Sequence, residues 1–300
     1  MDYLRPTTVA DTLSALATSG GTATLIAGGT DLIADMKFRG FQPTALININ
    51  QLEALRYIEE DASGLRIGGL TNVQAFIGNP VIEQRYTALT DSAARFASLQ
   101  VRNLATVAGS LGRASPGGDV APPLLALGAI VVAVSDEGER EIPLSEFFLG
   151  PRRTVLKPTE LVREIRVPAL PPRTGSAYAR LSYRDVLDLC IVGIASCVTL
   201  DAENRATSVR MGLGSVAARP VRAPNTEAFV AGKVLTDEVI AEAGRVSSGD
   251  ANPISDQRAS AEYRRLMVPV LTRRSLTRAR EMALATANAE GPNDREGSDR

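Results

Sequence analysis

The stretch Ala27-Gly28-Gly29-Thr30-Asp31-Leu32 joins a predicted strand at 23–26 to a predicted helix at about 31–39. Two adjacent glycines let the backbone turn sharply between a strand and a helix. They also expose N–H groups and admit a phosphate to close range, where the dipole of the following helix favours negative charge. Taken alone, the stretch predicts either a phosphate-binding turn or only a tight turn, and both interpretations stay open.

The residues around this turn complete a compact β-α-β unit. The order Thr8-Val9-Ala10-Asp11 has the shape of a capping box, and apolar residues follow at helical spacing, so a first helix is predicted from about 8 to 18. An apolar strand at 45–49 follows the second helix. These elements predict a first subdomain over residues 1–55.

Short strands and helices then alternate as far as a proline-rich linker. The predicted strands are 65–69, 130–134, 140–142 and 161–167, the middle two forming a hairpin. The predicted helices are 71–77, 88–97 and one that opens at Pro122-Pro123. This part is predicted to be a second subdomain over residues 56–170.

A separate C-terminal domain is predicted after the linker, over residues 176–285. Its expected strands and helices are 177–183, 190–200, 207–214, 236–247 and 258–284. The remaining residues, 286–300, are polar and charged, so we expect a disordered tail.

Composition excludes several classes of site. The chain has no His and only two Cys, which removes the usual ligands of zinc, haem and iron–sulfur centres, so no metal site is expected. The lack of His also excludes a Ser-His-Asp site, a histidine general base and the commonest residue for a covalent flavin link. A formal net charge of -1 leaves no basic field for nucleic acid.

Two further expectations follow from the residue pattern. Cys190 and Cys197 lie in an apolar stretch at a spacing that points them to opposite faces of a strand, so both are predicted to be buried, unpaired thiols. No apolar run reaches membrane-spanning length, and the first residues lack the order of a signal peptide. A cytoplasmic protein is expected.

A second stretch suited to a nucleotide runs from 100 to 119 and reads Gln-Val-Arg-Asn-Leu-Ala-Thr-Val-Ala-Gly-Ser-Leu-Gly-Arg-Ala-Ser-Pro-Gly-Gly-Asp. It is predicted to lie in one long loop from 100 to 120, and such loops are usually functional or disordered. Its groups that suit a diphosphate and a ribose are the hydroxyls of Thr106, Ser110 and Ser115, the N–H groups near Gly109 and the carboxylate of Asp119. An ordered surface loop without a ligand is the alternative.

Together the two stretches resemble the FAD-binding medium subunits of molybdenum hydroxylases, the xanthine dehydrogenase and carbon monoxide dehydrogenase flavoprotein family. The motifs of that family read A-G-G-x-x-L, and R-N-x-x-T-x-G-G-N followed by A-S-P-x-x-D; here they occupy 27–32 and 102–119. Residues 184–188, 213–222 and 253–265 also resemble its C-terminal domain. The resemblance covers nearly the whole chain to about residue 280.

The resemblance implies an α+β protein of the vanillyl-alcohol-oxidase (PCMH-like) type, with FAD between the first two subdomains. Backbone N–H groups of two segments would hold the pyrophosphate, namely those of Ala27, Gly28, Gly29, Thr30, Asp31 and Leu32 and those of Thr106, Gly109 and Ser110. Ser115 would add a hydrogen bond, and Asp119 would take the ribose hydroxyls.

Three further residues match positions that lie near the rings of the cofactor in the family. Phe96 would pack near the adenine, whereas Val162 and Arg180 would lie near the isoalloxazine. Without the resemblance, Phe96 reads as core, Val162 as an ordinary strand residue and Arg180 as a surface charge. The chain departs from the motif at Ala108, which replaces a Gly and is tolerable if its φ is negative, and at Ser110, which replaces an Asn.

The function implied by the resemblance is electron transfer within a molybdenum hydroxylase. A large subunit would carry the molybdopterin cofactor, a small subunit would carry the 2Fe–2S clusters, and this chain would hold FAD non-covalently, in a dimer of heterotrimers. No side chain of this chain need act as a catalytic acid or base, because the flavin supplies the chemistry. Two alternatives remain: a self-sufficient flavin oxidoreductase of the same fold, and a scaffold subunit without flavin.

Overall fold

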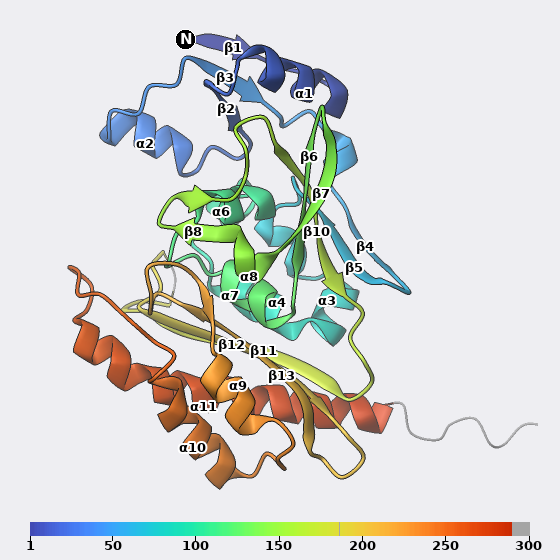
Figure 1. Cartoon of the computed structure of the whole chain (residues 1–300), viewed down its shortest axis with the longest axis vertical. Helices are drawn as coiled ribbons and strands as arrows, with labels where there is room; N and C mark the ends of the chain where they lie inside the picture. Colours follow the sequence, from blue (N-terminus) through green and yellow to red (C-terminus); the bar gives the residue numbers. More distant parts are fainter. Residues whose placement is uncertain (186, 290–300) are drawn as a thin grey trace, which may run out of the picture.

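The computed structural model describes residues 1–185 and 187–289. Three parts follow one another along the long axis of the molecule, in the order of the sequence (Figure 1). The predicted α+β class is confirmed, since parallel and antiparallel sheets occur in separate parts and each is accompanied by helices. No helix of the described ranges is long and apolar enough to cross a membrane.

The first part is the small parallel sheet of the N-terminus. Its elements are β1 (Asp2–Leu4), α1 (Val9–Thr18), β2 (Ala23–Ile26), α2 (Leu32–Phe38) and β3 (Ala45–Asn48), with strand order β1-β3-β2. Thr8 caps α1 by accepting a hydrogen bond from the N–H of Asp11, as the capping box predicts. The sequence did not indicate β1, because three residues are too few to show strand alternation and only pairing with β3 defines it.

The second part is built on a five-stranded antiparallel sheet. Its strands, in spatial order, are β4 (Ile58–Asp61), β5 (Gly64–Gly68), β10 (Leu161–Pro168), β6 (Ile130–Ser135) and β7 (Gly138–Pro143). The short elements around it are η1 (Glu53–Leu55), η2 (Val73–Phe76), α3 (Pro80–Arg85), α4 (Thr87–Arg95), α7 (Ala121–Ala126), α8 (Leu144–Phe147), β8 (Phe148–Gly150) and β9 (Arg153–Thr154). The predicted hairpin is confirmed as β6 and β7.

The prediction of one long loop from 100 to 120 is wrong. The segment holds two short helices, α5 (Leu99–Arg102) and α6 (Val107–Arg113). Ser98 and Thr106 cap them, because their side chains accept hydrogen bonds from the N–H groups of Val101 and Gly109. The glycine content suggested a loop, but two good N-caps and the buried Val107 and Leu111 of α6 favour helix.

The C-terminal part is a four-stranded antiparallel sheet between two layers of helices. Its elements are β11 (Thr174–Leu181), β12 (Val192–Leu200), β13 (Ala206–Gly214), β14 (Val221–Arg222), α9 (Pro224–Val230), α10 (Asp237–Ser247) and α11 (Ala261–Ala289). Helix α11 packs on one face of the sheet, and α4 and α7 of the second part pack against β11, β12 and β13. The second part and the C-terminal sheet thus share a packed interface.

Two glycines permit this close layering. A Cβ on Gly175 would lie 2.2 Å from the carbonyl oxygen of Ala279 in α11, and one on Gly212 would lie 2.1 Å from the carbonyl oxygen of Pro122 in α7. The helix backbones therefore approach the sheet more closely than any other residue type would allow.

The two ends of α11 differ from the prediction. The helix begins at Ala261 and extends to Ala289, so it includes residues 286–289, which the sequence analysis assigned to the tail. Residues 290–300 of the predicted tail lie outside the described residues. Cys190 and Cys197 are both buried and unpaired, as predicted.

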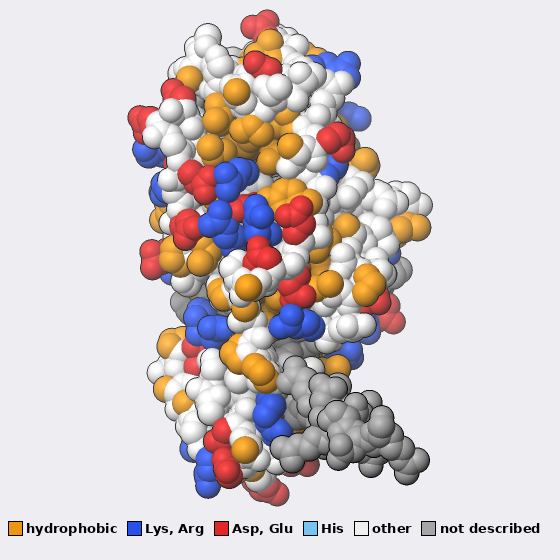
Figure 2. Space-filling model, turned by 90° about the vertical axis from the view of Figure 1, so that its right-hand side faces the viewer, with side chains coloured by type: hydrophobic (Ala, Val, Ile, Leu, Met, Phe, Trp, Pro, Cys, Tyr) orange, Lys and Arg blue, Asp and Glu red, His pale blue; other side chains and the backbone are white. Residues whose placement is uncertain are grey.

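A buried carboxylate organises the outer face of the five-stranded sheet. Glu164 of β10 is fully buried and accepts hydrogen bonds from Tyr57, from Arg66 at 2.9 Å and from Arg166 at 2.6 Å. Burial opposes its ionisation, but these hydrogen bonds outweigh burial and lower the pKa of Glu164 to about 2. Figure 2 shows acidic and basic side chains interspersed across the middle of the molecule.

We expect Glu164→Gln to lower the free energy of unfolding by about 1.5–3 kcal/mol at neutral pH, because it removes the charge that the neighbouring donors bind. Glu139→Gln is the control: Glu139 pairs with Arg163 on the same sheet but its side chain is 33% exposed, so the loss should stay below about 1 kcal/mol. Urea denaturation measures both.

The pH dependence gives a second check on Glu164. Its pKa is depressed in the folded state, so its stabilisation is complete above the ordinary glutamate pKa, about 4.3, and is lost as the pH falls toward about 2. The difference between wild type and Glu164→Gln should therefore shrink on acidification below that range. A difference that grew instead would contradict the hydrogen-bonded carboxylate.

Candidate functional site

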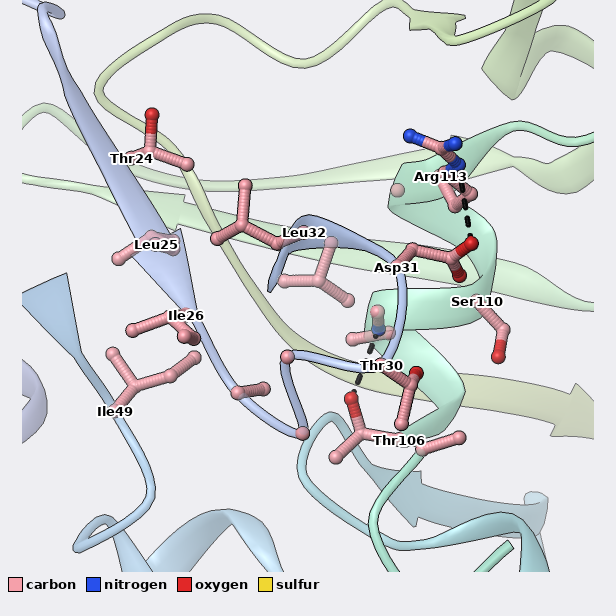
Figure 3. A pocket seen from close by; sticks show the side chains of 18 of the residues that line it. Thr24, Leu25, Ile26, Thr30, Asp31, Leu32, Ile49, Thr106, Ser110 and Arg113 are labelled. Carbon is pink, nitrogen blue, oxygen red and sulfur yellow. Dashed lines mark hydrogen bonds and ion pairs between the residues drawn. The ribbon is translucent and has the colours of Figure 1, made fainter. Parts of the chain in front are cut away.

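A cavity of about 540 Å³ lies between the first and second parts of the chain. Both glycine-containing stretches line it (Figure 3). Of the residues predicted to bind the cofactor, eleven line the cavity: Ala27, Gly28, Gly29, Thr30, Asp31, Leu32, Phe96, Thr106, Gly109, Ser110 and Val162. The fold thus brings together residues of β2, α2, α6 and β10, and Phe96 just after α4, which are far apart in the sequence.

Gly28 is the point at which the two stretches touch. A Cβ on Gly28 would lie 1.9 Å from the carbonyl oxygen of Leu104, a distance that no side chain tolerates. Gly29 has φ of +67°, the left-handed region that favours glycine, and a Cβ there would face the side chains of Ile33 and Ile26. Gly28 is therefore required for the loops to approach, and Gly29 for the turn.

The first stretch presents free hydrogen-bond donors. Among the described residues, no protein acceptor is found for the backbone N–H groups of residues 28–31. Asn50 stabilises this turn, because its side-chain amide donates a hydrogen bond to the carbonyl oxygen of Ala27 at 2.8 Å. The role of Asn50 was not predictable from the sequence, since nothing in its local pattern indicates a contact with residue 27. Unpaired N–H groups beside a cavity form a binding site for an anion.

The second stretch contributes in a different way from that predicted. The N–H groups of Val107 and Ala108 donate to the carbonyl oxygens of Thr71 and Gly69, and those of Gly109 and Ser110 are bonded to Thr106. The amides of residues 107–110 are therefore already paired, and this segment offers the cavity mainly its side chains, above all the Ser110 hydroxyl. Ala108 lies within α6 and is not among the residues with positive φ, so its methyl group causes no backbone strain.

One wall of the cavity is apolar, and most of it was not predicted from the sequence. Figure 3 shows Leu25, Ile26 and Ile49 on the side of the cavity opposite Ser110 and Arg113. Further apolar lining residues are Leu70, Phe96, Leu156, Leu161 and Val162. Apart from Phe96 and Val162, which the resemblance placed near the rings of the cofactor, these residues read as ordinary core in the sequence, because only the meeting of two subdomains leaves this surface unfilled.

Three predicted residues do not line the cavity: Ser115, Asp119 and Arg180. Asp119 is 5% exposed and accepts hydrogen bonds from the hydroxyl of Tyr178 at 2.7 Å and from Arg180 at 2.9 Å. Burial raises the pKa of Asp119 to about 6, against the effects of Arg180 and Tyr178. The ion pair links the second part to β11, and the predicted ribose contact of Asp119 stays a prediction.

Charged side chains lie at one rim of the cavity. Asp31 and Asp35 come from the turn and from α2, whereas Arg113 ends α6 and Arg152 lies between β8 and β9. Asp35 pairs with Arg113 and, at 3.4 Å, with Arg152, and Figure 3 shows the contact between Asp31 and Arg113. No cluster of three or more His, Cys, Asp or Glu side chains able to hold a metal occurs in the described ranges.

The arrangement can bind a ligand with an anionic centre and an apolar, flat part. The free N–H groups of residues 28–31 suit the anion, and the apolar wall suits a ring. The volume lies within the range of about 300–1,000 Å³ that is usual for cofactor sites.

The comparisons with known proteins agree with this arrangement. A family model described as "FAD binding domain in molybdopterin dehydrogenase" matches residues 1–170, and one described as "CO dehydrogenase flavoprotein C-terminal domain" matches residues 176–279. The carbon monoxide dehydrogenase medium chain of Hydrogenophaga pseudoflava is 33% identical over 93% of this chain and 96% of the relative.

Two further similarities extend over nearly the whole chain. The alpha subunit of the 6-hydroxypseudooxynicotine dehydrogenase complex of Paenarthrobacter nicotinovorans is 32% identical over 95% of this chain and 96% of its own length. A solved structure of carbon monoxide dehydrogenase from Hydrogenophaga pseudoflava, a form that lacks the Mo-pyranopterin moiety, superposes with a TM-score of 0.89 at 33% identity, over 94% of this chain and 98% of that chain.

We expect Gly28→Ala to lower the free energy of unfolding by about 1–3 kcal/mol, because the backbone at Leu104 must move to admit the added methyl group. Gly112→Ala is the matched control, since a Cβ there meets no atom within 4 Å and alanine favours helix α6. Thermal unfolding followed by circular dichroism compares the two. Equal stability of Gly28→Ala and wild type would show that the two stretches do not touch.

Proposed function

Because this chain belongs to the family of FAD-binding medium subunits of molybdenum hydroxylases, we propose that it holds one FAD non-covalently in the cavity between its first two parts. The observation that carries this proposal is the set of free N–H groups at residues 28–31, which line a cavity with an apolar wall. A dinucleotide with a central pyrophosphate and two aromatic ring systems has the matching chemistry.

The residues of this chain fit the cofactor at two places. The turn at 28–31 would hold the pyrophosphate, and the hydroxyls of Thr30 and Ser110 line the cavity beside it. Phe96 and Val162 belong to the apolar surface and would pack against the rings. Bound FAD supplies the redox chemistry, because it accepts electrons and passes them on.

We assign Asp119 and Arg180 a supporting role. Both side chains are buried, and both carboxylate oxygens of Asp119 already accept hydrogen bonds, so the pair would fix β11 to the connection between α6 and α7. Ser115 lies in the same connection to α7, outside the cavity lining. These residues would preserve the cavity by holding the second part and the C-terminal sheet together.

The proposed path of electrons enters from other subunits. A small subunit with 2Fe–2S clusters would deliver electrons to the FAD, and a large molybdopterin subunit would perform the hydroxylation, in a dimer of heterotrimers. The names of the relatives support this proposal, since one is the medium chain of a carbon monoxide dehydrogenase and another is a subunit of a dehydrogenase complex.

We expect the purified, flavin-free chain to bind one FAD, and Thr30→Ala or Ser110→Ala to weaken binding about tenfold, the loss expected for one hydrogen bond to a charged phosphate. Titration followed by the quenching of flavin fluorescence measures the dissociation constants. Thr207→Ala, an exposed change in β13, is the control and should bind as wild type does. A folded wild-type chain that bound no FAD would favour the scaffold alternative.

We also expect acid precipitation to release the flavin into the supernatant. The chain has no His, and both Cys are buried outside the cavity lining, so the common covalent attachments to these residues have no partner here. The absorption of the separated fractions gives the answer. Yellow colour that stayed with the precipitated protein would refute the non-covalent assignment.

A further inference from the structure

Helix α2 is held in an unusual way. It contains the apolar residues Ile33 and Phe38, yet these are 38% and 83% exposed, and the one buried residue of the helix is Asp35. An amphipathic helix normally buries an apolar stripe against the core. Helix α2 instead directs a carboxylate toward the second part of the chain.

The partners of this carboxylate belong to the second part of the chain. Arg113 at the end of α6 reaches both oxygens of Asp35, one of them at 3.3 Å, and Arg152 reaches one oxygen at 3.4 Å. The Asp35 side chain is 11% exposed and that of Arg113 is 20% exposed. All three residues line the cavity, so this ion-pair bridge joins the first part to the second at its rim.

The backbone of the second part orients both arginine side chains. Ala114 has φ of +46° and Arg152 has φ of +59°, although neither is glycine, and the N–H of Arg152 donates to the carbonyl oxygen of Ala114 at 3.1 Å. A left-handed conformation costs a non-glycine residue free energy and persists only where its surroundings require it. Here it places the two arginines side by side, facing Asp35.

We propose that the bridge of Asp35, Arg113 and Arg152 is a latch that retains FAD by closing α2 over the cavity rim. The inference rests on the proposed function, and it assigns the three residues as positioning residues: they act on the rate at which the cofactor leaves, and none of them is required to touch it. Helix α2 buries no apolar side chain, so the bridge is what holds it against the second part. Opening the cavity at this rim therefore requires breaking the bridge.

The charge state of the bridge suits this task. The hydrogen bond from Arg113, aided by the charges of Arg113 and Arg152 and opposed by burial, lowers the pKa of Asp35 below its usual range. The carboxylate therefore stays ionised at neutral pH. Because the contact is between partly exposed charges, added salt weakens it, so FAD release from the wild type accelerates with ionic strength.

The test measures FAD dissociation from the full chain by stopped-flow fluorescence at several salt concentrations. We expect Asp35→Asn to raise the dissociation rate constant about tenfold, and Arg113→Gln to raise it by a smaller factor, because Arg152 still reaches Asp35 at 3.4 Å. The double variant should release FAD about as fast as Asp35→Asn, since Asp31, the other partner of Arg113, is 60% exposed and its pair contributes little. The salt dependence should largely disappear in Asp35→Asn.

Arg39→Gln is the matched control. Arg39 pairs at 3.1 Å with the Asp35 oxygen that Arg152 also contacts. Arg39 lies one helical turn from Asp35, however, and does not connect α2 to the second part. This variant should keep the wild-type dissociation rate and its salt dependence. Thermal unfolding of each flavin-free variant confirms that the fold is intact.

Each outcome bears on the latch. Slower release from Asp35→Asn would mean that the freed arginines bind the cofactor themselves, which overturns the latch in favour of direct anion binding. An unchanged rate in Asp35→Asn and Arg113→Gln would overturn the latch and leave FAD binding standing. A folded wild-type chain that bound no FAD would overturn the proposed function together with the latch.

Discussion

The structure depends on one close approach between two backbones, that of Gly28 to the carbonyl of Leu104. The parallel sheet of the first part and the antiparallel sheet of the second are separate hydrogen-bonded units, so packing sets the distance between them. A shared hydrophobic cluster that includes Ile47 and Leu161 contributes to this packing, and the two loops meet most closely at Gly28. A side chain at position 28 would push the loops apart. The lack of one leaves the free N–H groups of the turn beside the second part, with a cavity between the two.

The C-terminal sheet supports this arrangement from the opposite side. Gly212 lets β13 approach α7, Gly175 lets α11 cover the other face, and the buried pair of Asp119 and Arg180 ties the start of α7 to β11. A buried ion pair fixes the relative orientation of two elements more than it adds to stability, because the desolvation of the two charges offsets much of their attraction. The interface therefore sets the orientation of α4 and α7, which flank the second stretch, rather than supplying a binding group of its own.

The charges of the molecule are distributed according to these constraints. The outer face of the five-stranded sheet is covered by paired acids and bases around Glu164, while the cavity is lined by backbone amides, hydroxyls and apolar side chains, with charges only at one rim and at the buried Glu160. The rim charges are paired across the boundary of two parts, so they bear on whether the cavity is open or closed.

The sequence alone determined the local elements and the family. The capping box at Thr8, the turn at 28–29 and the hairpin around Gly138 are short-range features, and each was predictable because its hydrogen bonds join neighbours in the chain. What needs partners distant in sequence was not predictable: β1, the hold of Asn50 on Ala27, the apolar wall, and the pairing of Asp119 with Arg180 and of Asp35 with Arg113. Even the N–H groups of 107–110, which read as ligand donors in the sequence, bond to carbonyls of residues 69 and 71 and to Thr106. A residue type fixes which bonds a group can make, but only the tertiary structure decides which acceptors are near enough to make them.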